Sequence, residues 1–230
     1  MDGSPETVVG GTAPSSDSRA HVLVRVWLPD RPGALGLVAS RVGAVDGDIV
    51  GIDVLERGET VAVDEFAVEL DNVELLELMV REIEEVDGVS VEEVRIVGTF
   101  PDPRLDALES AADLCDTESV GELHQGLVAQ TCREFLADWS ALLDPAHVVA
   151  RVGAAAPPDE MLLALAAGTA ASPLVADGTT GPDDLAVAVL DGHASTLLVG
   201  RDGHPFRRRE RAQLRALAHI ADRAWTLLDR

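Results

Sequence analysis

The stretch WLPDRPGALGLVAS, residues 27–40, contains an abrupt change of hydrophobic period at the tetrapeptide DRPG. Before it, the apolar residues alternate as in a strand with one buried face, at Val22, Val24, Val26 and Leu28. After it, they recur at helical spacing, at Leu35, Val38, Val42 and Val45. The sequence therefore predicts a strand that passes into a helix through a tight turn.

The residues after this helix predict a β-hairpin. Val50, Ile52 and Val54 alternate in one run, and RGET supplies a turn. The next run, VAVDEFAVELD, is expected to point Phe66, Val68 and Leu70 inward and its glutamates, Glu65 and Glu69, outward.

A second helix is predicted over residues 72–87, where Gly88 stops it. The run VSVEEVRIVG then predicts a fourth strand with a bulge at Glu92 and Glu93. The order strand, helix, strand, strand, helix, strand is the ferredoxin-like βαββαβ unit, which leaves one sheet face open. Leu23, Trp27 and Leu55 are expected on that open face, so self-association or the second half of the chain should cover it.

The second half predicts a separate antiparallel α+β domain over residues 119–230. A linker with a short helix occupies residues 99–118, and residues 1–19, rich in Gly, Ser, Thr and Pro, read as a disordered leader. Within the second domain we expect these elements in order: a helix over 119–137, a hairpin, a helix near 159–171, two strands and a helix over 207–228.

The charge of the chain limits its partners. The formal net charge is -23, and all 18 basic residues are arginine, so nucleic acid should be repelled. The segment RRRER, residues 207–211, is a local exception, with two readings: a solvated helix start, or a segment that docks on an acidic surface, which could be this protein's own. No apolar run approaches 18 residues, which predicts a soluble, cytoplasmic protein without membrane partners.

Signals for catalysis, metal or cofactor are missing from the sequence. There is no GxSxG, P-loop or strand-linked GxGxxG motif, and Cys115 and Cys132 form no CxxC pair. Cys132 lies on an apolar helix face and reads as a core residue. We therefore expect a protein that is not an enzyme and holds neither a metal nor a cofactor.

The DRPG turn carries the chemistry of a small-molecule site. A helix N-terminus offers unpaired N–H groups and partial positive charge to a carboxylate. Gly33 permits close approach to the backbone, and Pro32 fixes the entry angle. Asp30 could receive an α-ammonium group or serve as the helix cap. The competing hypothesis is that DRPG is only a strand-to-helix turn with an acidic cap.

Two family resemblances follow from these residues. Residues 20–98 resemble an ACT domain, a small amino-acid-binding regulatory module, through the motif DRPGAL and the βαββαβ order. Residues 119–228 resemble a GAF domain through LLVGRDGHPFRRRERAQLRALAHIADRAW. The ACT resemblance implies a ligand site between two domains, formed by Asp30, Arg31, Gly33, Ala34 and Leu35, with Asp48 and Ile49 from the neighbouring copy. The GAF-like half is expected to bind no haem, bilin or cyclic nucleotide.

These features predict a non-catalytic regulatory protein that senses a small ligand, an amino acid, and signals through assembly or contact with a protein partner. We expect a homo-oligomer, a dimer in the simplest case. Two alternatives stay open: an interaction module whose ligand sites are vestigial, and an enzyme without a recognisable motif.

Overall fold

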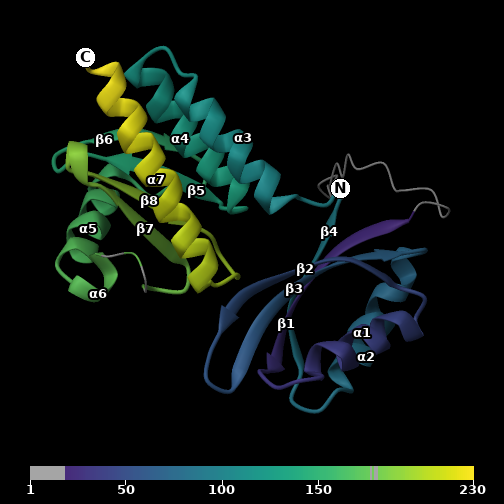
Figure 1. Ribbon diagram of the computed structural model, residues 1–230. Helices are drawn as coiled ribbons and strands as arrows, with labels where there is room; N and C mark the ends of the chain where they lie inside the picture. Colours follow the sequence, from purple (N-terminus) through teal and green to yellow (C-terminus); the bar gives the residue numbers. More distant parts are fainter. Residues whose placement is uncertain (1–18, 177, 179–180) are drawn as a thin grey trace, which may run out of the picture. The chain divides into compact units, whose positions relative to one another are not determined.

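The computed structural model describes residues 19–176, 178 and 181–230. The leader predicted over residues 1–19 therefore lies outside the described residues, except for Arg19. The fold is α+β, with two four-stranded antiparallel sheets. Contacts divide the chain into two compact units, one drawn from residues 1–53 and 58–100, the other from residues 54–57 and 101–230. The first sheet belongs to the first unit except at residues 54–57, and the second sheet belongs to the second unit (Figure 1).

The first unit follows the predicted order of elements. They are β1 (Ala20–Pro29), α1 (Ala34–Ala44), β2 (Asp48–Arg57), β3 (Val61–Leu70), the 3₁₀ turn η1 (Val73–Leu75), α2 (Leu76–Glu84) and β4 (Ser90–Val97). The strands lie in the order β2-β3-β1-β4, so β2 and β4 are the edges. Helices α1 and α2 contact each other beside the sheet (Figure 1). The register of β1 against β4 shifts between Arg25 and Val26, which confirms the predicted bulge.

The core of the first unit lies between the sheet and the two helices. Strand β1 supplies its even-numbered residues, and β3 supplies Phe66, Val68 and Leu70 as predicted. On α1 the buried face consists of Ala34, Val38 and Val42. The predicted helical stripe is wrong at its first member, because Leu35 is 39% exposed. Residues 34, 38 and 42 are four apart and share a face, whereas residue 35 is turned away by one position.

The opposite face of this sheet holds the buried Leu23, as predicted, but it also carries charge at its centre, which the sequence pattern did not predict. Arg25 donates to Glu65 from both Nε and Nη2, at 3.2 and 3.0 Å. Arg95 donates to Glu65 at 3.1 Å and lies 2.6 Å from Glu93. The four side chains form a balanced ion-pair network on adjacent strands, and Leu23 is buried beside them.

The second unit sandwiches its sheet between helices. Its elements are α3 (Pro103–Cys115), α4 (Val120–Glu134), β5 (Trp139–Leu143), β6 (Val148–Val152), α5 (Asp159–Ala170), α6 (Pro173–Ala176), β7 (Leu185–Leu190), the 3₁₀ turn η2 (Asp191–His193), β8 (Ser195–Gly200) and α7 (Arg208–Leu228). The strand order is β6-β5-β8-β7. Helices α3, α4 and α7 pack over one core, and α5 packs over another through Leu162 (Figure 1).

Buried arginines hold the start of α7, so the reading of RRRER as a solvated helix start is wrong. Arg207 and Arg211 are 8% and 4% exposed. Arg211 donates to the carbonyls of Leu185 and Pro182, at 2.8 and 2.6 Å, and so ties α7 to the start of β7. The backbone N–H of Arg207 donates to the Glu210 carboxylate at 2.7 Å, as part of a capping box.

Arg201 is the centre of this arrangement. Its guanidinium is 5% exposed and lies over the Phe206 ring, 4.0 Å from the ring centre. It donates to the Glu210 carboxylate at 2.9 Å and to three backbone carbonyls, those of Phe135, His204 and Pro205. One planar cation thus joins the end of α4, the loop after β8 and the start of α7.

Replacing Arg201 with methionine should lower the free energy of unfolding by about 3–5 kcal/mol, because the buried Glu210 carboxylate and the carbonyls lose their donor. Urea denaturation measures this change. The exposed neighbour Arg208 is the matched control, and Arg208→Met should alter stability by no more than about 0.5 kcal/mol. Equal effects of the two substitutions would contradict the central role of Arg201.

Candidate functional site

The loop that joins β1 to α1 is held between two other turns of the first unit. The backbone N–H of Asp30 donates to the carbonyl of Thr60, in the β2–β3 turn, at 2.9 Å. On the other side, a Cβ built on Gly88 would lie 3.0 Å from the ring of Pro29, so the α2–β4 turn packs against the end of β1. The loop therefore has a fixed backbone, as a preorganised binding site requires.

Gly33 sets the direction of α1. It is the N-cap residue, its φ is +91°, and no side chain caps the helix. Asp30, three residues earlier in the chain, is therefore not the N-cap residue. The left-handed backbone at Gly33 is the conformation that only glycine adopts without strain, and it completes the turn that Pro32 begins.

The first turn of α1 leaves two backbone donors unused. The N–H of Ala34 donates to Arg31 at 3.2 Å, and the N–H of Leu37 donates to Gly33 at 3.1 Å. Between them, the N–H groups of Leu35 and Gly36 have no acceptor within the described residues. Apart from the chain neighbours and the backbone of α1 itself, no atom lies within 4 Å of a Cβ built on Gly33 or Gly36, so no other part of the first unit packs on these two glycines. These are the groups that bind a carboxylate or phosphate oxygen at a helix N-terminus.

The structure places the five sequence-predicted residues of this loop together, with different exposures. Arg31, Gly33 and Leu35 are exposed, and Asp30 is half-buried. Ala34 is only 2% exposed because its methyl group packs in the core beneath the helix. The side chain of Ala34 is thus unavailable to a ligand, which leaves only its backbone for contact.

The other two predicted residues, Asp48 and Ile49, lie at the opposite end of the same sheet. Strand β1 begins at Ala20 opposite Leu70 and ends at Pro29 opposite Val61. A Cβ built on Gly47, immediately before β2, would lie 3.2 Å from Leu70. The start of β2 is therefore a strand's length from the DRPG loop, about 30 Å for nine residue steps.

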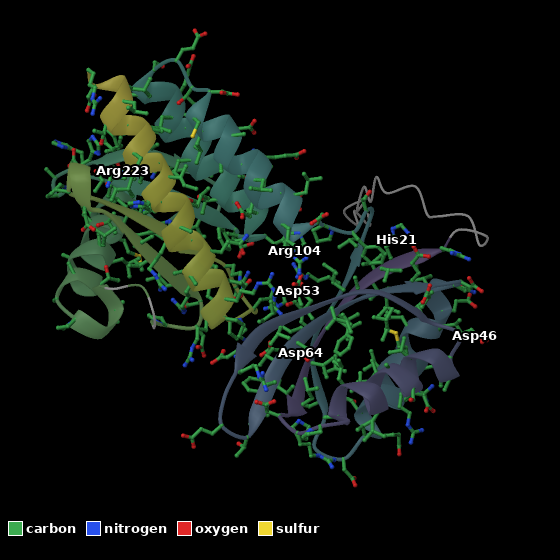
Figure 2. All side chains as sticks on the ribbon, viewed as in Figure 1. His21, Asp46, Asp53, Asp64, Arg104 and Arg223 are labelled. Atoms are coloured by element: carbon green, nitrogen blue, oxygen red, sulfur yellow. The ribbon has the colours of Figure 1, made fainter. Side chains whose placement is uncertain are left out.

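Figure 2 shows the same separation. Asp46, just before β2, lies toward the end of the first unit that also holds His21, near the start of β1. Within one chain, Asp48 and Ile49 therefore cannot contact a ligand bound at Gly33.

Gly36 is the residue of this loop that sequence reasoning missed. Its backbone N–H is one of the two open donors. The signal was present, because Gly33 and Gly36 are three residues apart and so border the same first turn of the helix.

Metal and membrane sites receive no support from the described part of the chain. No group of three or more His, Cys, Asp and Glu side chains is arranged to hold a metal ion there. Among the same residues, no helix combines the length and the apolar character that crossing a bilayer requires.

Comparisons with known proteins give distant structural likenesses. No family model and no curated protein matches the chain. Two solved structures of the ACT domain from GTP pyrophosphokinase of Chlorobium tepidum are similar to part of it. The crystal structure has 15% identity and a TM-score of 0.29, covering 35% of this chain and 100% of that domain. The solution structure has 16% identity and a TM-score of 0.28, covering 37% and 92%.

An unknown protein from Galdieria sulphuraria is similar over 92% of this chain and 95% of its own, with 10% identity and a TM-score of 0.33. Likenesses at these scores assign no family and transfer no activity. The chemistry of the site therefore has to be argued from its own residues.

Two glycines one turn apart allow a matched test of this geometry. Gly33→Ala should cost about 1–2 kcal/mol of stability, because its left-handed backbone is strained for any residue with a Cβ. Gly36→Ala should instead stabilise by about 0.4–1 kcal/mol, since Gly36 has a helical backbone and open space around it. Chemical denaturation measures the free energy of unfolding of both variants and the parent protein. The same sign for both changes would show that Gly33 is not left-handed in solution.

Proposed function

We propose that residues 20–98 form an ACT-type regulatory module that binds an amino acid at the N-terminus of α1. The observation that carries the proposal is the pair of open backbone donors at Leu35 and Gly36. The left-handed glycine beside them carries no side chain that could cover these groups. A ligand carboxylate is the group that satisfies both N–H groups and the positive end of the helix.

The residues before the helix supply the other half of the recognition. Asp30 follows the last residue of β1 and is half-buried, two residues ahead of Pro32. Its carboxylate is the group in this loop that would bind a ligand ammonium. A zwitterion with its carboxylate at Leu35 and Gly36 and its ammonium toward Asp30 would use both ends of the loop. Arg31, exposed between them, is positioned for a polar ligand side chain.

A second copy of the chain would complete the site by pairing along β2. Because β2 is an edge strand of its sheet, a strand of a second copy could pair with it. Antiparallel pairing of two β2 strands about a two-fold axis places the start of one beside the end of the other. The partner copy would then bring its own first β2 residues to the end of the sheet that holds the DRPG loop.

The side chains of β2 support this assembly. Val50, Ile52 and Val54 are 48%, 43% and 44% exposed, and they alternate along the strand. Soluble proteins usually protect edge strands with charge, proline or a bulge. Although β2 contains charged residues, it also exposes a row of β-branched apolar side chains suited to strand pairing. We propose this edge, in place of the charged face of the sheet, as the surface for self-association.

We propose that the second unit transmits the response to the ligand. We propose that it is a GAF-like module without catalytic activity, which conveys the ligand state of the first unit through assembly or contact with a protein partner. Its buried arginines and close-packed cores suit a rigid body. The alternative function, an interaction module with a vestigial ligand site, is favoured by one observation: the exposed apolar edge of β2 would support dimers with no ligand at all.

Amino-acid binding is tested first by thermal shift. A ligand that binds only the folded protein raises its melting temperature by mass action, and we expect such a rise with at least one of the common amino acids at millimolar concentration. Gly36→Asp should abolish the rise, because a carboxylate at the first helical turn repels the ligand carboxylate while it favours the helix. Gly36→Asn is the isosteric neutral control and should retain binding. No shift with any amino acid would contradict the ligand hypothesis.

Assembly is tested separately by light scattering. We expect a dimer at micromolar concentration, and Ile52→Lys should convert it to a monomer because charge on an edge strand opposes pairing. Leu108→Lys is the control, since Leu108 on α3 is 69% exposed and lies outside β2. A dimer that survives Ile52→Lys would place the interface elsewhere. A dimer without any amino-acid response would favour the interaction-module alternative.

A further inference from the structure

Three aromatic rings from three elements stack at the C-terminal end of α7. Trp225 on α7 lies parallel to the imidazole of His193 on η2, with ring centres 4.0 Å apart and an angle of 7° between the planes. The imidazole of His124, on α4, meets the same indole edge-on at 4.1 Å and 68°. We call these three residues the ring stack. It connects α4, η2 and α7 far along the chain from the amino-acid site.

Acidic side chains of α7 hold one side of the ring stack. His193 Nδ1 lies 2.7 Å from Asp222 Oδ1, and His193 Nε2 lies 3.4 Å from Asp229 Oδ2. The N–H of Gly192 donates to the second Asp222 oxygen at 3.0 Å. Burial raises the pKa of Asp222, but the hydrogen bonds from His193 and Gly192 outweigh it, so its pKa lies below the ordinary value. Asp222 therefore stays ionised in mild acid.

His124 is the member of the ring stack without a counter-charge at contact distance. It is 9% exposed, and its Nε2 is buried with no hydrogen-bond partner among the described residues. Burial lowers the pKa of His124, and positive charge on His193 lowers it further, while Asp229 acts in the opposite direction. In the folded protein, His124 is therefore neutral in conditions where an exposed histidine takes up a proton.

Among the described residues, the other elements packed against α4 add no carboxylate that acts on His124. On α3, Asp113 accepts a hydrogen bond from Gln130. On β6, Arg151 pairs with Asp159. Strands β5 and β8 carry no titratable side chain. On α7, His219 acts on Asp222 and lies one turn before it. The groups that act on His124 are thus His193 and Asp229.

We propose that protonation of His124 releases the C-terminal end of α7, so that the second unit carries an acid-sensitive latch at the ring stack. An imidazolium at this position would be buried against the Trp225 ring and near His193. Its Nε2–H would have no hydrogen-bond acceptor among the described residues. Opening of the last turns of α7 exposes His124 to water, which solvates the charge. The device is independent of the amino-acid site.

The sign of the pH dependence follows from linkage. The folded-state pKa of His124 is lowered from 6.5, so its contribution to stability is lost as pH falls. Above that ordinary value both the closed and the open state hold His124 neutral, and pH has no effect through this group. Between the ordinary value and the lower folded value, only the open state takes the proton. In that window the open population should rise by as much as about tenfold per pH unit.

Hydrogen exchange of the backbone amides in the last two turns of α7 tests this proposal. After correction for the intrinsic pH dependence of exchange, their opening should increase toward about tenfold per unit as pH falls below 6.5. His124→Phe keeps the ring but removes the titration, and should flatten the profile. His147→Gln, at an exposed turn position, should leave the parent profile unchanged. A parent profile that is flat, or equally steep in His124→Phe, would overturn the proposal.

The NMR titration of the His124 ring in the unmodified protein tests the same idea without a variant. We expect the midpoint of this titration to lie below 6.5, because the closed state resists protonation and only the open state takes up the proton readily. A midpoint at or above that value would show that the closed fold accommodates the proton, and the latch would be ruled out even if His124→Phe failed to fold.

Discussion

The left-handed backbone of Gly33 is the constraint on which the first unit depends. Strand β1 lies between β3 and β4 and cannot reverse direction gradually, so the chain must leave the sheet within a few residues. Pro29 and Pro32 end the ladder, and the positive φ of Gly33 turns the backbone into α1. That turn buries Ala34, Val38 and Val42 against the sheet. The open donors of Leu35 and Gly36 result from the same geometry, so fold and candidate site share one cause.

Buried guanidinium groups serve the second unit in a comparable way. Aromatic residues make up only 3% of the chain, and the cores are built mainly from Val, Leu, Ile and Ala. Contacts between such aliphatic side chains are not directional, so they do not fix the orientation of one element against another. Arg201 and Arg211 fix it, since each has donors in a fixed fork that matches a particular set of carbonyls. Their long aliphatic stems pack while their charge is satisfied by backbone oxygens and Glu210.

Hydrophobic periodicity predicted the order of elements well, because each strand and helix buries a continuous face. It was less accurate where the choice of face depended on one residue. Leu35 outranks Ala34 in hydrophobicity, yet the close approach of α1 to the sheet selects the smaller side chain. The charged network around Arg25 was missed because each acid and arginine seemed an ordinary outward residue, and only the register of three strands brings them together.

In the candidate site, too, some features could be predicted from local sequence and others depend on contacts between distant residues. The loop from Asp30 to Leu35 was predictable because proline and glycine have local backbone requirements. The separation of Asp48 and Ile49 from that loop depends on strand register, which no local pattern contains. The RRRER segment could not be assigned from sequence either, because the acceptors of Arg211 lie on residues 182 and 185, remote in sequence. The partner of Arg201 in α4, Phe135, is more remote still.

The backbone amide signals of α1 give the most direct test of the central claim, that the first helical turn receives a ligand carboxylate. In a ¹H–¹⁵N NMR titration of the intact protein with each amino acid in turn, a binding amino acid should produce saturable shifts, largest at the amides of Leu35 and Gly36. Amino acids that leave both signals unmoved at millimolar concentration, or shifts confined to residues remote from α1, would contradict the account and leave the DRPG loop as a turn alone.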